Sequence, residues 1–274
     1  MFASTELARR IEQSGCRLLR EAAAFVRDSV VEPIGGGAAL FAGADSPLTK
    51  VFGIGFAGPI EARDLERIER AWAERGAAVN IELATLAEAG VAEQLSRRGY
   101  VLAGFEDVLG RRLDESLAAE PLADGVSIAV SDAQELQTWI DVSVEAFAQP
   151  DGEGVSSHEP IARDALRRVL RQIAPRNTCY LARRNGVPAA AASMTVVGDV
   201  MWLNGMATLP EHRRHGLQTA LLAARLADAR ARGAEIATVT TLPGSKSKQN
   251  VERRGFSLLC SRAVMRRAPA AQQR

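Results

Sequence analysis

The sequence is poor in cysteine, lysine and aromatic residues and has no long hydrophobic segment. Its three cysteines, Cys16, Cys179 and Cys260, are odd in number and form no CxxC pair, which argues against a disulfide framework or a zinc ribbon. No run approaches the roughly 20 apolar residues that cross a bilayer, and charges interrupt the N-terminal stretch where a secretory signal must be apolar. We therefore expect a cytoplasmic protein with no membrane partner.

An excess of charge of either sign is also missing. Lys and Arg total 34 against 33 Asp and Glu, which gives a formal net charge of +1. A nucleic-acid-binding protein usually shows a clear basic excess or a basic block, so we expect no nucleic-acid partner. With 274 residues, 47% hydrophobic and 24% charged, the composition fits a globular protein of one large or two average domains.

Helical and strand periodicities alternate along the whole chain. Helices are expected over residues 1–30, 59–76, 86–98, 139–147, 161–173 and 217–233, with a short one near 250. Strands are expected at 30–43, 50–56, 77–83, 100–113, 126–130, 179–184, 188–197, 200–209 and 235–242, with a strand pair over 256–267. Asn185-Gly186 predicts a hairpin turn, and residues 116–125 are the best candidate for a linker.

Two blocks of sequence recur in the same order. Residues 73–86 match 230–242, and residues 95–102 match 251–259, so that Gly76 corresponds to Gly233 and Gly99 to Gly255. Chance similarity in a chain rich in Ala and Arg is the alternative. The constant order favours an internal duplication, with one domain over 1–120 and a second over 126–268.

The most informative segment is TLPEHRRHGLQTALLAA, residues 208–224. It joins a strand to a helix through a short loop that contains Arg213 and Gly216. Backbone N–H groups at a helix start lack partners within the helix, and the helix dipole is positive there, so the place suits a phosphate group. Gly216 lets a ligand approach the backbone without a Cβ in the way. An ordinary turn with solvated arginines is the alternative reading of this segment alone.

Together with the order of elements, this loop resembles the GNAT superfamily of acyl-CoA N-acyltransferases. The family's pyrophosphate loop, Q/R-x-x-G-x-G/A, is matched by Arg213 and Gly216, whereas Gln218 departs from its last position. A second block, an Asn in a short helix before a Gly-aromatic strand start, is matched by Asn250 and Gly255-Phe256. The resemblance covers residues 126–266. It implies an α/β (α+β) fold of two lobes, each with a mixed, mostly antiparallel sheet flanked by helices.

The resemblance also implies a coenzyme site in the second lobe, with acetyl-CoA as the acyl donor and a small-molecule amine as the acceptor. Asn250 would hydrogen-bond the pantetheine arm. The strand end at Met206, Ala207 and Thr208 would pair with pantetheine. The residues of the pyrophosphate loop would be Arg213, Arg214, His215, Gly216, Leu217, Gln218 and Thr219. No metal is expected, because the HxxH spacing of His212 and His215 has no evident third ligand. A homodimer is compatible with the sequence.

The catalytic groups are less well defined. Many family members place a Tyr that serves as general acid where this chain has Val251, so the acid is left unassigned. Glu145 and His158 are candidates for the base, because they lie where the family builds its acceptor site. Asn204 is a candidate for the wall of that site. The acidic loop 151–159 favours a cationic amine.

A rival motif lies in the first half of the chain. Gly53-Ile54-Gly55-Phe56-Ala57-Gly58 is a literal GxGxxG, and Glu82 ends a later strand as a ribose-binding acid would. This pattern would make the protein an NAD- or FAD-dependent oxidoreductase. However, Glu82 is 29 residues from the first Gly rather than about 20, and the repeat places Gly58 near Gly216.

The sequence therefore favours an acetyl-CoA-dependent N-acetyltransferase with its chemistry in the second lobe. Gln94 stands where the second lobe has Asn250, so we interpret the first lobe as a degenerate copy. Two alternatives stay open, namely a non-catalytic acyl-CoA-binding or interaction protein on the same fold, and the oxidoreductase.

Overall fold

The computed structural model describes residues 3–114, 122–149, 155 and 162–269. Contacts divide the chain into two compact units. We call residues 2–109 with 258–274 the N-terminal lobe, and residues 110–257 the C-terminal lobe. None of the helices in these described ranges is long and apolar enough to cross a membrane.

The N-terminal lobe is built on a six-stranded sheet. The strand order is β1-β2-β3-β4-β11-β5. Its elements are α1 (Thr5–Ala23), β1 (Val30–Ile34), β2 (Gly37–Phe41), β3 (Lys50–Phe52), α2 (Ala62–Ala73), β4 (Val79–Ala84), α3 (Ala89–Arg97), β5 (Val101–Arg112) and β11 (Ser257–Arg267). Strand β11, from the end of the chain, pairs antiparallel with β4, with Arg262 opposite Ala84 and Arg267 opposite Val79. The last strand of the sequence is thus an inner strand of the first lobe.

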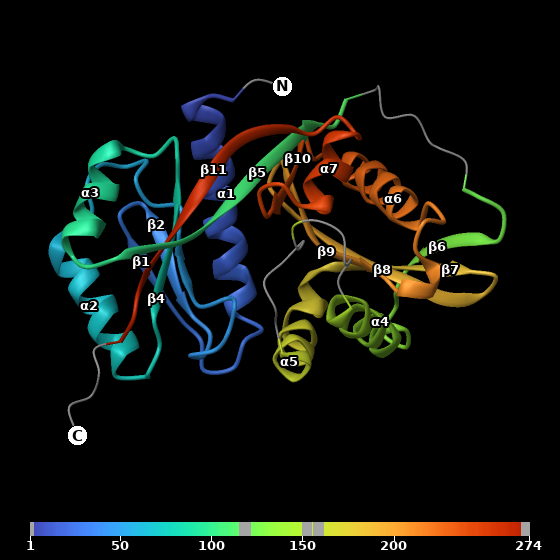
Figure 1. Ribbon diagram of the computed structural model, residues 1–274, viewed down its shortest axis with the longest axis horizontal. Coiled ribbons are helices and arrows are strands. Elements are labelled where there is room, and N and C mark those ends of the chain that lie inside the picture. The colour runs from blue at the N-terminus through green and yellow to red at the C-terminus, as the bar shows by residue number, and fades with distance from the viewer. Residues whose placement is uncertain (1–2, 115–121, 150–154, 156–161, 270–274) are drawn as a thin grey trace. The chain divides into compact units, whose positions relative to one another are not determined.

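Helices cover both faces of this sheet (Figure 1). On one face, α2 and α3 bury Leu65, Ile68, Trp72 and Leu95 against Ile81. On the other face, α1 buries Ile11 and Leu19. Each helix carries its apolar side chains at a spacing of three or four residues, which places them on one stripe facing the sheet.

The C-terminal lobe has the strand order β6-β7-β8-β9-β10. Its elements are β6 (Val126–Val130), α4 (Leu136–Ala148), α5 (Arg163–Ile173), β7 (Thr178–Arg184), β8 (Val187–Val197), β9 (Val200–Thr208), α6 (Leu217–Ala231), β10 (Ile236–Thr241) and α7 (Lys246–Glu252). Helix α6 covers one face of the sheet, and α4 and α5 cover the other (Figure 1). Strands β6 to β9 are antiparallel neighbours, whereas β9 and β10 are parallel.

Most expected elements are confirmed, and two are corrected. Residues 30–43 form two strands joined at Gly35 and Gly36, both at positive φ, rather than one. Residues 257–267 form the single strand β11 rather than a strand pair. The hairpin turn at Asn185-Gly186 is confirmed, with φ of 52° and 81°. The expected linker lies largely in residues 115–121, outside the described residues.

The division into lobes also differs from the expected ranges of 1–120 and 126–268. Residues from Leu258 onward group with the N-terminal lobe. The pattern of residues 257–267 predicts a strand but carries no information on which sheet the strand joins. That choice depends on contacts far away in the sequence, with α1 and β4.

The two repeated blocks fold alike. Gly76, Gly99, Gly233 and Gly255 each follow a helix and have φ between 69° and 83°. After each of them, the next backbone N–H bonds the carbonyl five residues back, as in Ala77 to Trp72 at 2.9 Å and in the equivalent bond of the second block. This is the Schellman ending that favours glycine. In addition, β3–β4 and β9–β10 are both parallel pairs. Similar sequence and similar local geometry therefore coincide.

Candidate active site

Strands β9 and β10 separate in the middle of the C-terminal lobe. Their pairing runs from Val200–Ile236 to Trp202–Thr238, yet β9 continues to Thr208 and β10 to Thr241. Beyond Trp202, the backbone of β9 has β8 as its paired neighbour. Residues 206–208 are half-buried. Among the described residues, one edge of β9 therefore has no paired strand beyond Trp202, and we call it the released edge. An extended ligand can pair with this edge as an added strand does.

A bulge marks the place where β9 changes direction. Ser193 pairs with Asn204 and Ala192 with Met206, so Gly205 is an extra residue without an opposite partner. A bulge of this kind bends a strand and redirects its side chains. A Cβ on Gly205 would lie 3.4 Å from the ring of Phe147, so a side chain here would press against α4.

The loop from Leu209 to Gly216 follows β9 and opens helix α6. Arg214 has φ of 65° and Gly216 has φ of 74°, and no side chain in the described part of the chain caps the helix start. Gly216 is exposed, and a Cβ added there would meet no atom of the described residues within 4 Å. The first N–H groups of a helix have no partner within it. The loop therefore presents an open, positively polarised helix start next to the released edge of β9.

Side chains near this loop bind the protein itself. Arg213 donates from Nε to the carbonyl of Thr208 at 3.2 Å and from Nη2 to the carbonyl of Gln149. Its guanidinium thus ties the loop to the ends of β9 and α4. The amide of Asn250, on α7, donates to Oε1 of Gln218 at 2.7 Å. Gln218 belongs to the expected pyrophosphate loop and Asn250 to the second block of the resemblance. The two residues are therefore in direct contact.

Comparison with known proteins agrees with this geometry. The profile of the acetyltransferase (GNAT) family matches residues 142–256. This segment of the chain is therefore similar to the GNAT acetyltransferase domain. The matched segment contains the separated strands, the loop before α6 and Asn250. No curated protein sequence matches the chain.

Solved structures show a similar fold over most of the chain. A GCN5-related N-acetyltransferase from Kribbella flavida superposes with a TM-score of 0.68 at 22% identity, covering 97% of each chain. A tandem GNAT protein from the clavulanic acid biosynthesis pathway gives a TM-score of 0.64 at 12% identity, over 94% of this chain and 89% of that one. A GCN5-related N-acetyltransferase from Sphaerobacter thermophilus gives 0.54 at 14% identity, over 76% and 64%.

Within residues 142–256, the candidate catalytic residues lie in different surroundings. Asn204 donates from Nδ2 to Oγ1 of buried Thr195 at 3.0 Å, on the bulged part of β9. Glu145, on α4, forms an ion pair with Arg163 at 2.7 Å and accepts from Gln149 at 2.5 Å. As a base, it would first have to leave these partners. His158 and most of the acidic loop lie outside the described residues.

The position of the missing acid is buried. Val251, which stands where many GNAT members have a Tyr, is 4% exposed and belongs to the core. The three cysteines are also buried, and burial raises the pKa of Cys16 and Cys260 to about 11 and of Cys179 to about 12. Their thiols are therefore protonated at neutral pH and are poor nucleophiles. Among the described residues, no group of three or more His, Cys, Asp or Glu is placed to hold a metal ion.

The rival GxGxxG segment has another environment. A Cβ on Gly53 would lie 2.3 Å from Sγ of Cys16, because α1 packs directly on this glycine. Helix α2 begins only at Ala62, so the glycines do not lead directly into a helix start as the dinucleotide fingerprint requires. Glu82, the expected ribose acid, bonds the ammonium of Lys50 instead. The oxidoreductase interpretation thus loses its phosphate site and its ribose ligand.

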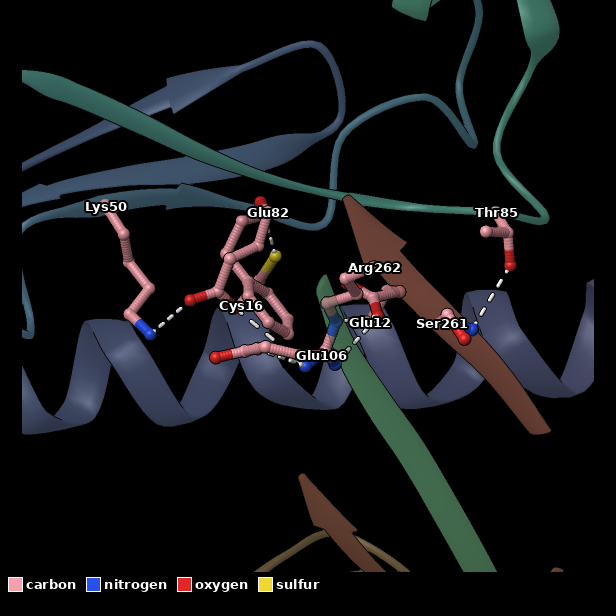
Figure 2. A network of polar contacts seen from close by, with 9 residues as sticks. Glu12, Cys16, Lys50, Glu82, Thr85, Glu106, Ser261 and Arg262 are labelled. Atoms are coloured by element: carbon pink, nitrogen blue, oxygen red, sulfur yellow. Dashed lines mark hydrogen bonds and ion pairs between the residues drawn. The ribbon is translucent and has the colours of Figure 1, made fainter. Parts of the chain in front are cut away.

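Glu82 belongs to a buried charge cluster in the N-terminal lobe, formed by Glu12, Lys50, Glu82, Glu106 and Arg262 (Figure 2). Arg262 donates from Nε to Oε1 of Glu12 at 2.9 Å, and its Nη1 lies 3.9 Å from Glu82 and 3.8 Å from Glu106. Burial raises the pKa of Glu12 in spite of Arg262. For Glu82, the cations Lys50 and Arg262 outweigh burial and lower its pKa.

Two buried residues that bond the strands at the bulge are not among those expected from the sequence. Trp139, on α4, donates from Nε1 to the carbonyl of Ala192 on β8, beside the bulge, at 2.9 Å. Arg225 was not singled out, although it lies among apolar positions of α6 and is 1% exposed. The signal that could have identified it is its spacing. Arg225 follows the buried Leu221 and Leu222 by four and three residues, where the helical pattern predicts an apolar side chain.

Proposed function

We propose that this protein is an acetyl-CoA-dependent N-acetyltransferase for a small amine, with its chemistry in the C-terminal lobe. The observation that carries the proposal is the released edge of β9 directly before an uncapped helix start at Gly216. The first feature suits an extended amide-containing arm, and the second suits a pyrophosphate. Coenzyme A has both groups in that order.

The residues present fit such a ligand. Backbone N–H groups of residues 214–219 would hold the pyrophosphate, and the open space at Gly216 lets phosphate oxygens approach the helix start. Residues Met206, Ala207 and Thr208 would pair with the pantetheine amides, and Asn250 would add a side-chain hydrogen bond. The bound coenzyme supplies an acyl thioester.

The chain's part in the reaction is to position and polarise. Backbone N–H groups of β9 near the bulge would polarise the thioester carbonyl while the acceptor nitrogen forms its bond to that carbon. The carbon–sulfur bond then breaks, and the sulfur leaves with the electron pair. The acceptor must lose a proton to Glu145, His158 or water. Because Val251 has no proton to give, the sulfur leaves as a thiolate or takes its proton from water.

A second candidate is a protein on the same fold that binds acyl-CoA without turnover. The buried Val251 favours it, since this position cannot supply an acid. The two candidates differ in one observable, the release of thiol from acetyl-CoA. A panel of small amines and peptides, incubated with the protein and acetyl-CoA, should give amine-dependent thiol release if the protein is an enzyme. Binding without release from any amine would favour the second candidate.

Substitution at Gly216 tests the coenzyme site directly. Gly216→Glu places a carboxylate where the pyrophosphate should bind, so we expect acetyl-CoA binding by calorimetry to fall at least tenfold. Gly233→Glu, at the other end of the same helix, is a matched control, because this glycine also has positive φ and open space around a Cβ. Both changes cost roughly 1–2 kcal/mol of backbone strain. Equal binding by the two variants would contradict the proposed site.

A further inference from the structure

Arg225 is a buried cation without a carboxylate. It lies on the sheet-facing side of α6, among the buried residues Leu221, Leu222 and Leu226, and is 1% exposed. Burial of a guanidinium is costly unless its donors are satisfied. In the described part of the chain, no Asp or Glu forms an ion pair with it. Burial lowers the pKa of Arg225 to about 9, so it is still charged at neutral pH.

Its donors converge on the bulge of β9. Nη1 donates to the carbonyl of Ser193 at 3.0 Å and lies 3.5 Å from the carbonyl of Asn204. Nη2 lies 3.1 Å from Sδ of Met206. Ser193 and Asn204 are the last pair before the unpaired Gly205, and Met206 is the first residue after it. One guanidinium therefore holds both sides of the irregularity.

The fourth contact fixes the guanidinium itself. Nε donates to the carbonyl of Leu221, one turn earlier in α6, at 3.1 Å. A planar fork held in this way offers its remaining donors in a set geometry, and charged donors bond carbonyls more strongly than neutral ones. Trp139 holds Ala192, also next to the bulge, from the helix on the other face of the sheet. The bulge is thus fixed from two helices.

We infer that Arg225 is a positioning residue, which sets the path of β9 after Gly205 so that residues 206–208 present their backbone groups to the pantetheine arm. The inference rests on the proposed function. Under this inference, α6 contributes to the coenzyme site in two ways. Its first turn binds phosphate, and its third turn shapes the strand that binds the rest of the coenzyme.

The test separates the two halves of the ligand. ADP carries only the pyrophosphate half, whereas CoA also needs β9. Arg225→Met keeps a long apolar side chain but removes every donor, so we expect the Kd for CoA to rise at least tenfold while the Kd for ADP stays within twofold. Leu222→Ala, a buried change on the same helix, controls for lost stability and should shift the two Kd values by the same factor.

Arg225→Lys is the second variant, because it keeps the charge but cannot reach both carbonyls at once. We expect it to fold and to weaken CoA severalfold, again without an effect on ADP; it decides the question if Arg225→Met does not fold. Equal effects on ADP and CoA, or no effect on CoA, would overturn the positioning role. A wild-type protein that binds neither ligand would instead refute the proposed function, and with it this inference.

Discussion

The side chain of Gln218 stands at the one position of the loop that departs from the family pattern. Its amide oxygen accepts from Asn250, and Thr219, the next residue, accepts from Nη2 of Arg254 at 2.9 Å. The first turn of α6 is therefore bonded to α7 and the turn after it through neighbouring residues. The bond to Gln218 occupies one of the two N–H donors of Asn250, so a pantetheine arm that recruits this donor competes with Gln218.

Gln218→Ala should therefore strengthen the binding of CoA. The bond that is lost is worth about 0.5–1.5 kcal/mol, which corresponds to a Kd roughly 2–10 times lower. Asn250→Ala should raise the Kd for CoA. In the double variant, Gln218→Ala should change this Kd no further, because its effect depends on Asn250. Calorimetry on the two single variants and the double variant measures this coupling. Weaker binding by Gln218→Ala would show that Gln218 is itself a ligand.

At the scale of elements, β11 is the part of the N-terminal lobe held by the most unusual contacts. Arg262 sits in a cluster of buried carboxylates (Figure 2). Its guanidinium also lies 4.4 Å from the ring centroid of Phe52. Next to it, Ser261 donates to Asp107 at 2.6 Å. A register shift of one residue would turn Arg262 away from Glu12 and toward the opposite face. The cluster therefore specifies the register of β11 as well as its place.

Arg262→Met should destabilise the N-terminal lobe by about 3–5 kcal/mol, because it leaves Glu12 buried without the cation that is bonded to it. Adding Glu12→Gln should recover part of this loss, since the unpaired charge is removed. Arg266→Met, on an exposed position of the same strand, is the matched control and should change stability by less than about 0.5 kcal/mol. Urea unfolding followed by circular dichroism compares the variants. A double variant less stable than Arg262→Met would contradict this account.

At the scale of the whole molecule, the chain returns at its end to the lobe in which it began. Strand β11 lies between β4 and β5, so the sheet of the N-terminal lobe is incomplete without residues near position 262. The folding of the first lobe therefore depends on residues 257–267, which lie far from it in the sequence. A boundary placed near residue 120 would remove an inner strand.

A fragment of residues 1–120 should accordingly fail to fold by itself. The same fragment with residues 256–269 appended through a flexible linker should regain a cooperative unfolding transition, because the appended segment supplies β11 and Arg262. Circular dichroism and limited proteolysis of the two fragments provide the comparison. Cooperative unfolding of residues 1–120 alone would show that β11 is dispensable.

The sequence predicts features that depend on neighbouring residues and misses those that depend on distant ones. Periodicity identifies most helices and strands, and the glycines after α2, α3, α6 and α7 mark their ends because only a positive φ closes these turns. By contrast, Glu12, Glu82 and Arg262 look like ordinary polar positions until distant strands bring them together. Arg225 likewise acquires its role only from the bulge opposite it.

The central claim is that the C-terminal lobe binds acyl-CoA between the released edge of β9 and the start of α6. Hydrogen exchange measured by mass spectrometry, with and without acetyl-CoA, tests it most directly. We predict new protection in residues 203–208 and 214–219 and around Asn250, with none at the glycine-rich segment 53–58. Protection confined to residues 53–58, or no change at saturating acetyl-CoA, would contradict the claim.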